Sequence, residues 1–204
     1  MGLKIGLTGQ IGTGKSTIGF LLKGKGAQII EADTIVGKLL NTKDIREAIQ
    51  HRVSSTVFDL EGNIDKKKLG NIVFNDAKSL VILEEILHPP TIQIMQEKLR
   101  KGEFCGKDTI VVGIVPLLLE TGLKSLFDQI VLVQSNLNNQ LTRSQKNLGL
   151  SPEDTLKRIS RQMPQDEQKK YADYVIQNND GLKELEEQTV QLWNQLKQTL
   201  KQGE

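Results

Sequence analysis

The stretch Gly9-Gln10-Ile11-Gly12-Thr13-Gly14-Lys15-Ser16 fits the pattern G-x-x-x-x-G-K-[ST]. It follows Leu3–Thr8, an apolar run that predicts a buried strand, and it precedes residues 17–23, which predict a helix. This order is typical of a phosphate-binding loop, because glycines let backbone N–H groups turn inward and the helix N-terminus adds a positive dipole end. Lys15 is then expected to reach the β- and γ-phosphates of a nucleoside triphosphate, and the Ser16 hydroxyl is expected to bind Mg²⁺.

The composition favours a protein that binds neither nucleic acid nor membrane. The 204 residues include 27 basic and 25 acidic side chains, which is less excess positive charge than a nucleic-acid-binding surface normally carries. No apolar run approaches the ~20 residues that a membrane span needs, and the N-terminus does not read as a signal peptide. Cys105 is the only cysteine, so the chain has no intrachain disulfide and a reducing compartment fits. We expect a cytoplasmic protein that is a monomer or a weak homo-oligomer.

Apolar runs alternate with helical patterns along the chain, which predicts βαβ units and a parallel sheet. Several of these runs are nearly continuous in Ile, Leu and Val, as expected for strands covered on both faces. The sequence therefore predicts an α/β fold with a doubly wound, five-stranded parallel sheet. The expected strands are residues 4–7, 27–30, 109–115, 129–133 and 174–176. The chain closes with an amphipathic helix carrying Leu182, Leu185, Leu192, Leu196 and Leu200, and its Trp193 is expected to dock against the core.

The segment between Asp33 and Lys107 is too long for one crossover helix and is expected to hold an inserted helical subdomain. Within it, Asp65 is expected to start one helix. Asp76 begins another, which His88-Pro89-Pro90 is expected to end or kink before a further helix follows.

A second helical segment is expected after the fourth strand. Residues 136–146 predict a helix, which residues 147–150 break. Ser151 as N-cap, Pro152 in the first turn and Asp154 three residues after the cap predict where the next helix begins. This helix-turn-helix is rich in Arg and Lys, and it is where a mobile lid over the nucleotide is expected.

Asp33 stands just past the second predicted strand. In a doubly wound sheet, the carboxyl ends of neighbouring strands line the ligand crevice. A carboxylate there is placed to accept a proton from a substrate hydroxyl as that hydroxyl attacks the γ-phosphoryl group, or to orient Mg²⁺ through a water. It also suits the N-cap of a helix from Thr34 onwards, and the two roles do not exclude each other.

Taken together, these residues resemble the dephospho-coenzyme A kinase family nearly end to end. The phosphate loop alone is unspecific, but the ordered series of later motifs is highly specific. The matching stretches are LTGQIGTGKST at residues 7–17, EAD at 31–33, Asp65 through Phe74, Leu87-His88-Pro89, Val115 to Glu120, Arg143, Gln162-Met163-Pro164, and Ala172 to Ile176 followed by Asn178.

The resemblance implies an enzyme that uses ATP and Mg²⁺ to phosphorylate the ribose 3′-hydroxyl of dephospho-coenzyme A, giving coenzyme A and ADP. It implies Lys15, Asp33 and Arg143 as catalytic residues, with Asp33 as the base and Arg143 closing over the ATP phosphates. It places Asp33, Lys66, His88 and Glu120 on the acceptor side. ATP would be bound by Gly9, Gly12, Thr13, Gly14, Lys15, Ser16 and Thr17, with Ser16 on the metal.

The resemblance also implies one kinase domain over residues 1–204. Its core is expected at residues 1–35, 107–140 and 172–204, its helical acceptor-binding insertion at 36–106 and its lid at 141–171. The chain departs from the family at Gly37, Lys66 and Asn147, where arginine is common. Lys38 is a candidate substitute, but lysine lacks the bidentate fork of arginine, so weaker binding of the acceptor's phosphates is a hypothesis here.

Two other classes of protein carry similar features. Another small-molecule or nucleotide kinase on the same fold would have a similar loop and a residue like Asp33. A regulatory GTPase would match Asp59-Leu60-Glu61-Gly62 as D-x-x-G, but the preceding SSTVF is a poor buried strand and no N-K-x-D motif follows, so a polar turn is the better interpretation.

Overall fold

The computed structural model describes residues 2–103 and 108–202. Cys105 and the expected boundary between insertion and core at residues 106 and 107 lie outside this range. The described chain forms two compact units, one made of residues 1–31 and 98–204 and the other of residues 32–97. Each unit is described separately below.

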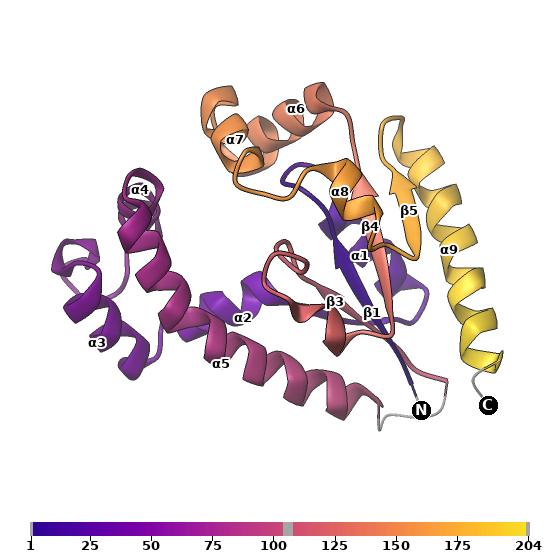
Figure 1. The fold of residues 1–204 in the computed structure, drawn as a ribbon, viewed down its shortest axis with the longest axis horizontal. Helices are drawn as coiled ribbons and strands as arrows, with labels where there is room; N and C mark the ends of the chain where they lie inside the picture. The colour runs from indigo at the N-terminus through magenta and orange to yellow at the C-terminus, as the bar shows by residue number, and fades with distance from the viewer. Residues whose placement is uncertain (1, 104–107, 203–204) are drawn as a thin grey trace. The chain divides into compact units, whose positions relative to one another are not determined.

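The first unit is built on a five-stranded parallel sheet, as predicted (Figure 1). Its strands are β1 (Leu3–Thr8), β2 (Gln28–Glu31), β3 (Ile110–Ile114), β4 (Gln129–Gln134) and β5 (Tyr174–Gln177), in the order β2-β3-β1-β4-β5. All four pairings are parallel, and Leu7 lies opposite Ile114 on one side and Val131 on the other. Because β1 is central, the phosphate loop that follows it lies between the ends of β3 and β4.

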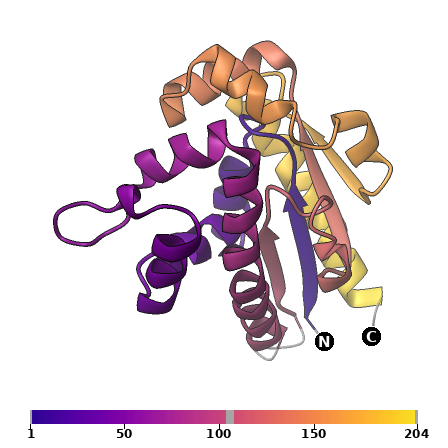
Figure 2. The same ribbon diagram turned by 60° about the vertical axis from the view of Figure 1, so that its left-hand side comes forward.

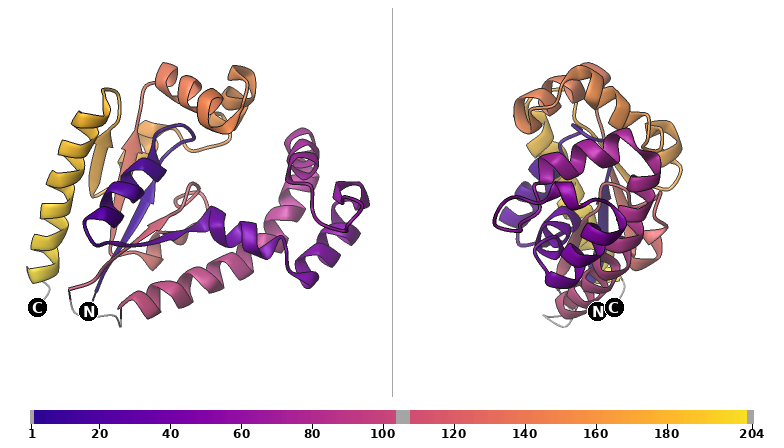
Figure 3. Two further views of the ribbon diagram at one scale, coloured as in Figure 1. Left: turned by 180° about the vertical axis from the view of Figure 1, so that it is seen from behind. Right: turned by 90° about the vertical axis from the view of Figure 1, so that its left-hand side faces the viewer.

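Two helices cover one face of this sheet, α1 (Lys15–Gly24) and α9 (Leu182–Gln202), and Figure 3 shows them from their own side. Their leucine and isoleucine side chains join those of the strands in one buried cluster, against which Trp193 packs as predicted. Leu182 is the exception to the predicted apolar face, because it is the first residue of α9 and is 59% exposed.

The remaining helices of this unit are α6 (Leu137–Leu148), α7 (Pro152–Ile159) and α8 (Gln165–Lys169), with a short 3-10 turn, η2, at Leu123–Leu126. Figures 1 and 2 show α8 beside β4, and α6 and α7 beyond the end of β4. The break between α6 and α7 is where the sequence predicts it, since Gly149 ends α6 in the left-handed conformation, φ 65°.

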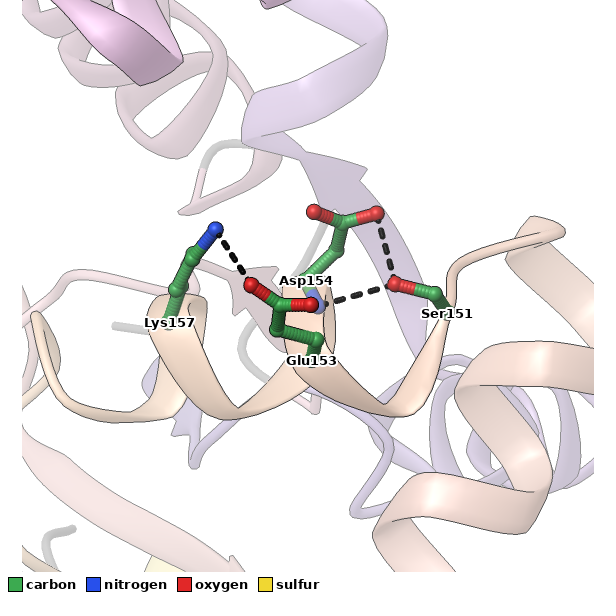
Figure 4. Close-up of polar contacts among 4 residues, drawn as sticks. All are labelled: Ser151, Glu153, Asp154 and Lys157. Carbon is green, nitrogen blue, oxygen red and sulfur yellow. Dashed lines mark hydrogen bonds and ion pairs between the residues drawn. The ribbon is translucent and has the colours of Figure 1, made fainter.

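The start of α7 confirms the predicted cap in detail (Figure 4). The Ser151 hydroxyl accepts from the backbone N–H of Asp154 at 3.0 Å and donates to the Asp154 carboxylate at 2.8 Å. Along α7, Glu153 and Lys157 are four residues apart and form an exposed ion pair at 2.9 Å. This contact raises the pKa of the Lys157 ammonium. These local contacts stabilise the start of α7.

The second unit is helical. It contains α2 (Ala32–Leu39), α3 (Lys43–Arg52), the 3-10 turn η1 (Ser55–Val57), α4 (Lys66–Asn75) and most of α5 (Ala77–Glu103). The stretch that matches D-x-x-G is a polar turn, as predicted, because the Asp59 carboxylate accepts from the backbone N–H groups of Glu61 and Asn63. The Asp59 side chain thus closes a local turn.

One expectation for this unit is corrected by the structure. The possibility that His88-Pro89-Pro90 ends a helix is wrong, because α5 runs through both prolines to Glu103. Proline removes one N–H donor and crowds the preceding turn, which usually stops a helix. Here the buried side chains of Ile86, Leu87 and Met95 flank the two prolines on one continuous helix, and burial outweighs the lost hydrogen bonds.

Asp65 caps α4, as the sequence predicts. Its carboxylate accepts from the backbone N–H groups of Lys67 at 2.9 Å and Lys68 at 3.1 Å. The hydrogen bond from Lys68, followed by the Lys67 bond and the charges of both lysines, lowers the pKa of Asp65 below its ordinary 3.8.

We expect Asp65→Ala to lower the Tm at neutral pH, because α4 loses the acceptor for two N–H groups. A carboxylate with a lowered folded-state pKa contributes stability above its unfolded pKa and loses it as the pH falls through the folded value. The Tm difference between wild type and Asp65→Ala should therefore be full above about pH 5 and shrink below the ordinary pKa of 3.8. Thermal melts followed by circular dichroism at several pH values test this, and a difference independent of pH would contradict it.

Candidate active site

The loop between β1 and α1 has the backbone of a phosphate-binding loop. Gly9, Gly12 and Gly14 all have positive φ, at 143°, 74° and 98°. This left-handed backbone turns successive N–H groups toward one side, which makes a concave anion site. Gly14 is the N-cap of α1 and no side chain caps that helix. The positive end of the α1 dipole therefore has no side-chain cap, which suits a phosphate at this position.

Lys15 and Ser16 stand at the first two positions of α1. The Lys15 ammonium donates to the carbonyl oxygens of Gly9 at 2.7 Å and Gln10 at 2.9 Å, so its charge lies over the loop. Ser16 is exposed, and within the described residues its hydroxyl has no hydrogen bond to protein. An exposed hydroxyl beside a phosphate site suits Mg²⁺, which prefers oxygen ligands and takes most of them from phosphates and water. The described residues contain no group of three His, Cys, Asp or Glu side chains that would hold a metal without the nucleotide.

Helix α6 packs directly against this loop. The Gln140 amide is buried and donates to the Ile11 carbonyl at 3.1 Å and to the Gln10 side-chain oxygen at 3.3 Å. A Cβ built on Gly12 would lie 2.5 Å from the Gln140 carbonyl oxygen and 2.9 Å from the Ser144 hydroxyl. The second glycine of the loop is thus required by the close approach of α6 as well as by its backbone conformation.

We expect Gly12→Ala to lower the Tm and to raise the KM for ATP about tenfold, because the α6 backbone must move away and the left-handed φ costs about 1–2 kcal/mol with a side chain. Gly24→Ala is the matched control, since that glycine lies at the end of α1 with no neighbour within 4 Å and without a positive φ. The control should melt at or slightly above the wild-type temperature. Equal behaviour of the two variants in melts and ATP titrations would contradict the close-packing argument.

The segment Gln162-Met163-Pro164 also contacts the loop. The Gln162 side-chain oxygen accepts from the Ile11 N–H at 2.8 Å, and the Gln10 amide donates to the Met163 carbonyl at 3.0 Å. The Met163 N–H in turn donates to the Glu120 carboxylate at 2.8 Å. Glu120, an expected acceptor-side residue, therefore lies two hydrogen-bonded steps from the phosphate loop.

Arg143 is on α6, three residues after Gln140. Its guanidinium donates to the Ser135 hydroxyl at 3.1 Å and to Asn178 twice, at the backbone carbonyl (3.0 Å) and the side-chain oxygen (3.1 Å). Partial burial lowers the pKa of Arg143 from its ordinary value, and the group stays charged at neutral pH. Arg143 thus brings a fixed positive charge to residues that contact the loop.

A polar pocket of about 440 Å³ opens beside Gln10, between the ends of β4 and β5 and the start of α8. Its only charged lining residue is Asp166. The pocket therefore suits a neutral hydrogen-bonding group better than a phosphate. Its lining consists of Gln10, Gln134, Ser135, Asn136, Pro164, Gln165, Asp166, Gln177 and Asn179.

The other expected site residues belong to the second unit. Asp33 is exposed in the first turn of α2, and because α2 begins at Ala32 its expected N-cap position is wrong. Lys66 is the exposed first residue of α4, and its ammonium lies 3.6 Å from where a Cβ on Gly37 would be. His88 is half-buried within α5, which continues past it to Glu103.

Sequence reasoning did not assign roles to Gln10, Ser135 or Gln140, and it quoted Gln162 and Asn178 only as parts of motifs. One local signal was available for Gln140, since a residue three positions before Arg143 lies on the same helix face. The others contact the loop from distant parts of the chain.

Comparison with known proteins identifies a family. A family model described as dephospho-CoA kinase matches residues 3–184. Dephospho-CoA kinase of Listeria monocytogenes is 34% identical over 192 residues, covering 93% of this chain and 95% of that protein. Its counterpart from Aquifex aeolicus is 35% identical over 194 residues, covering 95% and 97%.

Comparison with solved structures also finds a dephospho-CoA kinase. Dephospho-CoA kinase from Campylobacter jejuni has a TM-score of 0.72 at 25% identity, covering 98% of this chain and 99% of that one. Shikimate kinase from Acinetobacter baumannii, at 13% identity and a TM-score of 0.54 over 96% and 93% of the two chains, shares the fold.

Proposed function

This chain belongs to the dephospho-CoA kinase family, and from that premise we propose how its residues carry out the family's reaction. The reaction transfers the γ-phosphoryl group of ATP to the ribose 3′-hydroxyl of dephospho-coenzyme A and yields coenzyme A and ADP. Phosphoryl transfer asks little covalent chemistry of a protein, so positioning and charge stabilisation must supply most of the rate. The observation that carries the proposal is the uncapped, left-handed glycine loop with the Lys15 charge over it.

On the donor side, residues 9–17 bind the ATP phosphates through backbone N–H groups and Lys15 neutralises the β- and γ-phosphates. The Ser16 hydroxyl holds Mg²⁺, which supplies further neutralisation of the phosphate charge. Arg143 adds a planar guanidinium that bonds developing negative charge on the phosphoryl oxygens. Its three hydrogen bonds to Ser135 and Asn178 support this role, because they fix the guanidinium before ATP arrives.

On the acceptor side, Asp33 serves as the general base. As the 3′-oxygen forms its bond to the γ-phosphorus, the proton of that hydroxyl passes to the Asp33 carboxylate and the bond to the β–γ bridging oxygen breaks, releasing ADP. The position of Asp33 two residues after the last residue of β2 supports this role, since parallel strands present their carboxyl ends to the ligand. Water competes as acceptor, so closure of the lid is expected before transfer.

Lys66, His88 and Glu120 are proposed to contact the acceptor. The Lys66 ammonium lies beside Gly37, a position where the family resemblance implies arginine, and it supplies a positive charge where glycine has no side chain to do so. An ammonium is a point charge without the bidentate fork of arginine. We therefore expect this chain to bind the acceptor's phosphates more weakly. A KM for dephospho-coenzyme A as low as that of relatives with arginine there would contradict this expectation.

We also propose where the enzyme works and in what oligomeric state. The enzyme works in the cytoplasm, where ATP is available, and as a monomer or a weak homo-oligomer. In the described ranges, every helix is too short or too polar to cross a lipid bilayer. Light scattering coupled to size-exclusion chromatography measures the oligomeric state directly.

The test is ADP release from ATP and Mg²⁺ with dephospho-coenzyme A, and with adenosine, shikimate or nucleoside monophosphates in its place. We expect turnover that depends on dephospho-coenzyme A, with ³¹P spectra placing the new phosphate on the ribose 3′-oxygen. Turnover with one of the other acceptors alone would overturn the proposed acceptor and favour a different small-molecule kinase on the same fold.

A further inference from the structure

Asn178 follows the last residue of β5 and is only 5% exposed. Its backbone N–H donates to the Gln134 carbonyl at 2.8 Å, which continues the pairing of β5 with β4 by one residue. The end of the sheet therefore fixes the direction in which the Asn178 side chain points.

The two ends of the Asn178 amide contact two different parts of the site. The amide nitrogen donates to the carbonyl oxygen of Thr13 in the phosphate loop at 2.8 Å. The amide oxygen accepts from the Arg143 guanidinium at 3.1 Å. One asparagine can bond both partners because its side chain carries a donor and an acceptor on the same planar group.

Other contacts around Asn178 complete the arrangement. The Ser135 hydroxyl donates to the Asn178 backbone carbonyl at 2.7 Å and accepts from Arg143. A Cβ built on Gly14 would collide with the Asn178 amide nitrogen, so the third loop glycine leaves space for this side chain. Within the described residues, the guanidinium uses three of its five N–H donors here, which leaves two for a ligand.

We propose that Asn178 is a positioning residue for the kinase reaction, which holds the Arg143 guanidinium and the phosphate loop in one fixed relation. This inference rests on the proposed role of Arg143 in transfer. Asn178 acts through Arg143 and Thr13 and touches no reacting atom. Arginine side chains are long, and a guanidinium displaced by about 1 Å from a phosphoryl oxygen loses much of its effect, since misplacement on that scale costs about 100-fold in rate.

The test is a double-mutant cycle on Asn178→Ala and Arg143→Ala, with kcat, KM for ATP and Tm measured for each enzyme. We expect Asn178→Ala to lower kcat about 10-fold to 100-fold and to change the KM for ATP much less. The double variant should then be within about twofold of Arg143→Ala alone, because Asn178 has nothing left to position.

Two further variants separate positioning from simple support of the fold. Gln188→Ala is the matched control, because the Gln188 amide also makes two hydrogen bonds to the end of β5, at Gln177, but none to the loop or to Arg143. It should lower the Tm without the loss in kcat. Asn178→Asp keeps the shape but replaces the donor to Thr13 with a charged oxygen, and we expect it to fold and to lose at least as much kcat as Asn178→Ala.

The other possible outcomes would contradict either the role of Asn178 or the role of Arg143. Losses in kcat that multiply in the double variant, or an Asn178→Asp enzyme as fast as wild type, would overturn the inference while leaving the role of Arg143 intact. An Arg143→Ala enzyme with wild-type kcat would instead overturn the proposed role of Arg143 itself.

Discussion

Replacing Lys15 with alanine is expected to lower kcat by about 1,000-fold, the largest single loss that we predict for the donor side. The ammonium is the one charged side chain that the phosphate loop itself carries, and it lies within 2.9 Å of two loop carbonyls. Its charge is most valuable in the transition state, where negative charge moves toward the leaving oxygen of ADP. Steady-state ADP release with saturating dephospho-coenzyme A measures the loss.

The loss must be separated from damage to the loop, because the Lys15 ammonium also bonds the Gly9 and Gln10 carbonyls. Lys23→Ala is the matched control, since Lys23 is an exposed lysine in the last turn of the same helix and, among the described residues, makes no hydrogen bond to the loop. Near-native Tm for both variants with activity lost only for Lys15→Ala is the expected pattern. Retention of more than about a tenth of the wild-type kcat would contradict the phosphate-loop mechanism.

The features predicted correctly from sequence are those determined by neighbouring residues. The loop between β1 and α1, the Ser151 cap and the Gly149 break each depend on a short continuous segment, so their local patterns carry the information. The strands β1, β3 and β4 could be predicted for a similar reason, since a nearly continuous apolar run indicates a strand that is covered on both faces. The order β2-β3-β1-β4-β5 depends on which strands pair, and no local pattern states that.

The supports of the site were harder to predict, because they come from far along the chain. Gln140, Gln162 and Asn178 reach the loop across 130, 151 and 165 residues respectively. An amide side chain in a helix or at a strand end gives no signal of its own, since the same residue types are common on surfaces. Only the pairing of β1 with β4, and of β4 with β5, brings these amides to the loop.

The continuous helix α5 is a second feature that a local sequence pattern does not predict. Two consecutive prolines are a strong local signal for a helix end, yet Leu87 and Met95 on either side of them are buried. Whether the prolines end the helix or burial of the flanking side chains keeps it continuous depends on tertiary packing, and the local sequence pattern shows only the effect of the prolines.

Replacing Asp33 with asparagine is expected to lower kcat by about 100-fold to 10,000-fold while the affinity for ATP changes little, which is the typical loss on removal of a general base. Asparagine keeps the size and most of the hydrogen bonding of aspartate but cannot accept the proton of the 3′-hydroxyl. Asp44→Asn is the matched control, because Asp44 is likewise an exposed acid in the first turn of a helix of the second unit.

Paired measurements of kcat with dephospho-coenzyme A and of ATP binding by titration calorimetry distinguish the possible roles of Asp33. A collapse in ATP affinity would mean that Asp33 orients the metal–nucleotide complex, and an unchanged kcat would remove it from the reaction. Loss of kcat alone would place the base at the first turn of α2, where the end of β2 delivers it.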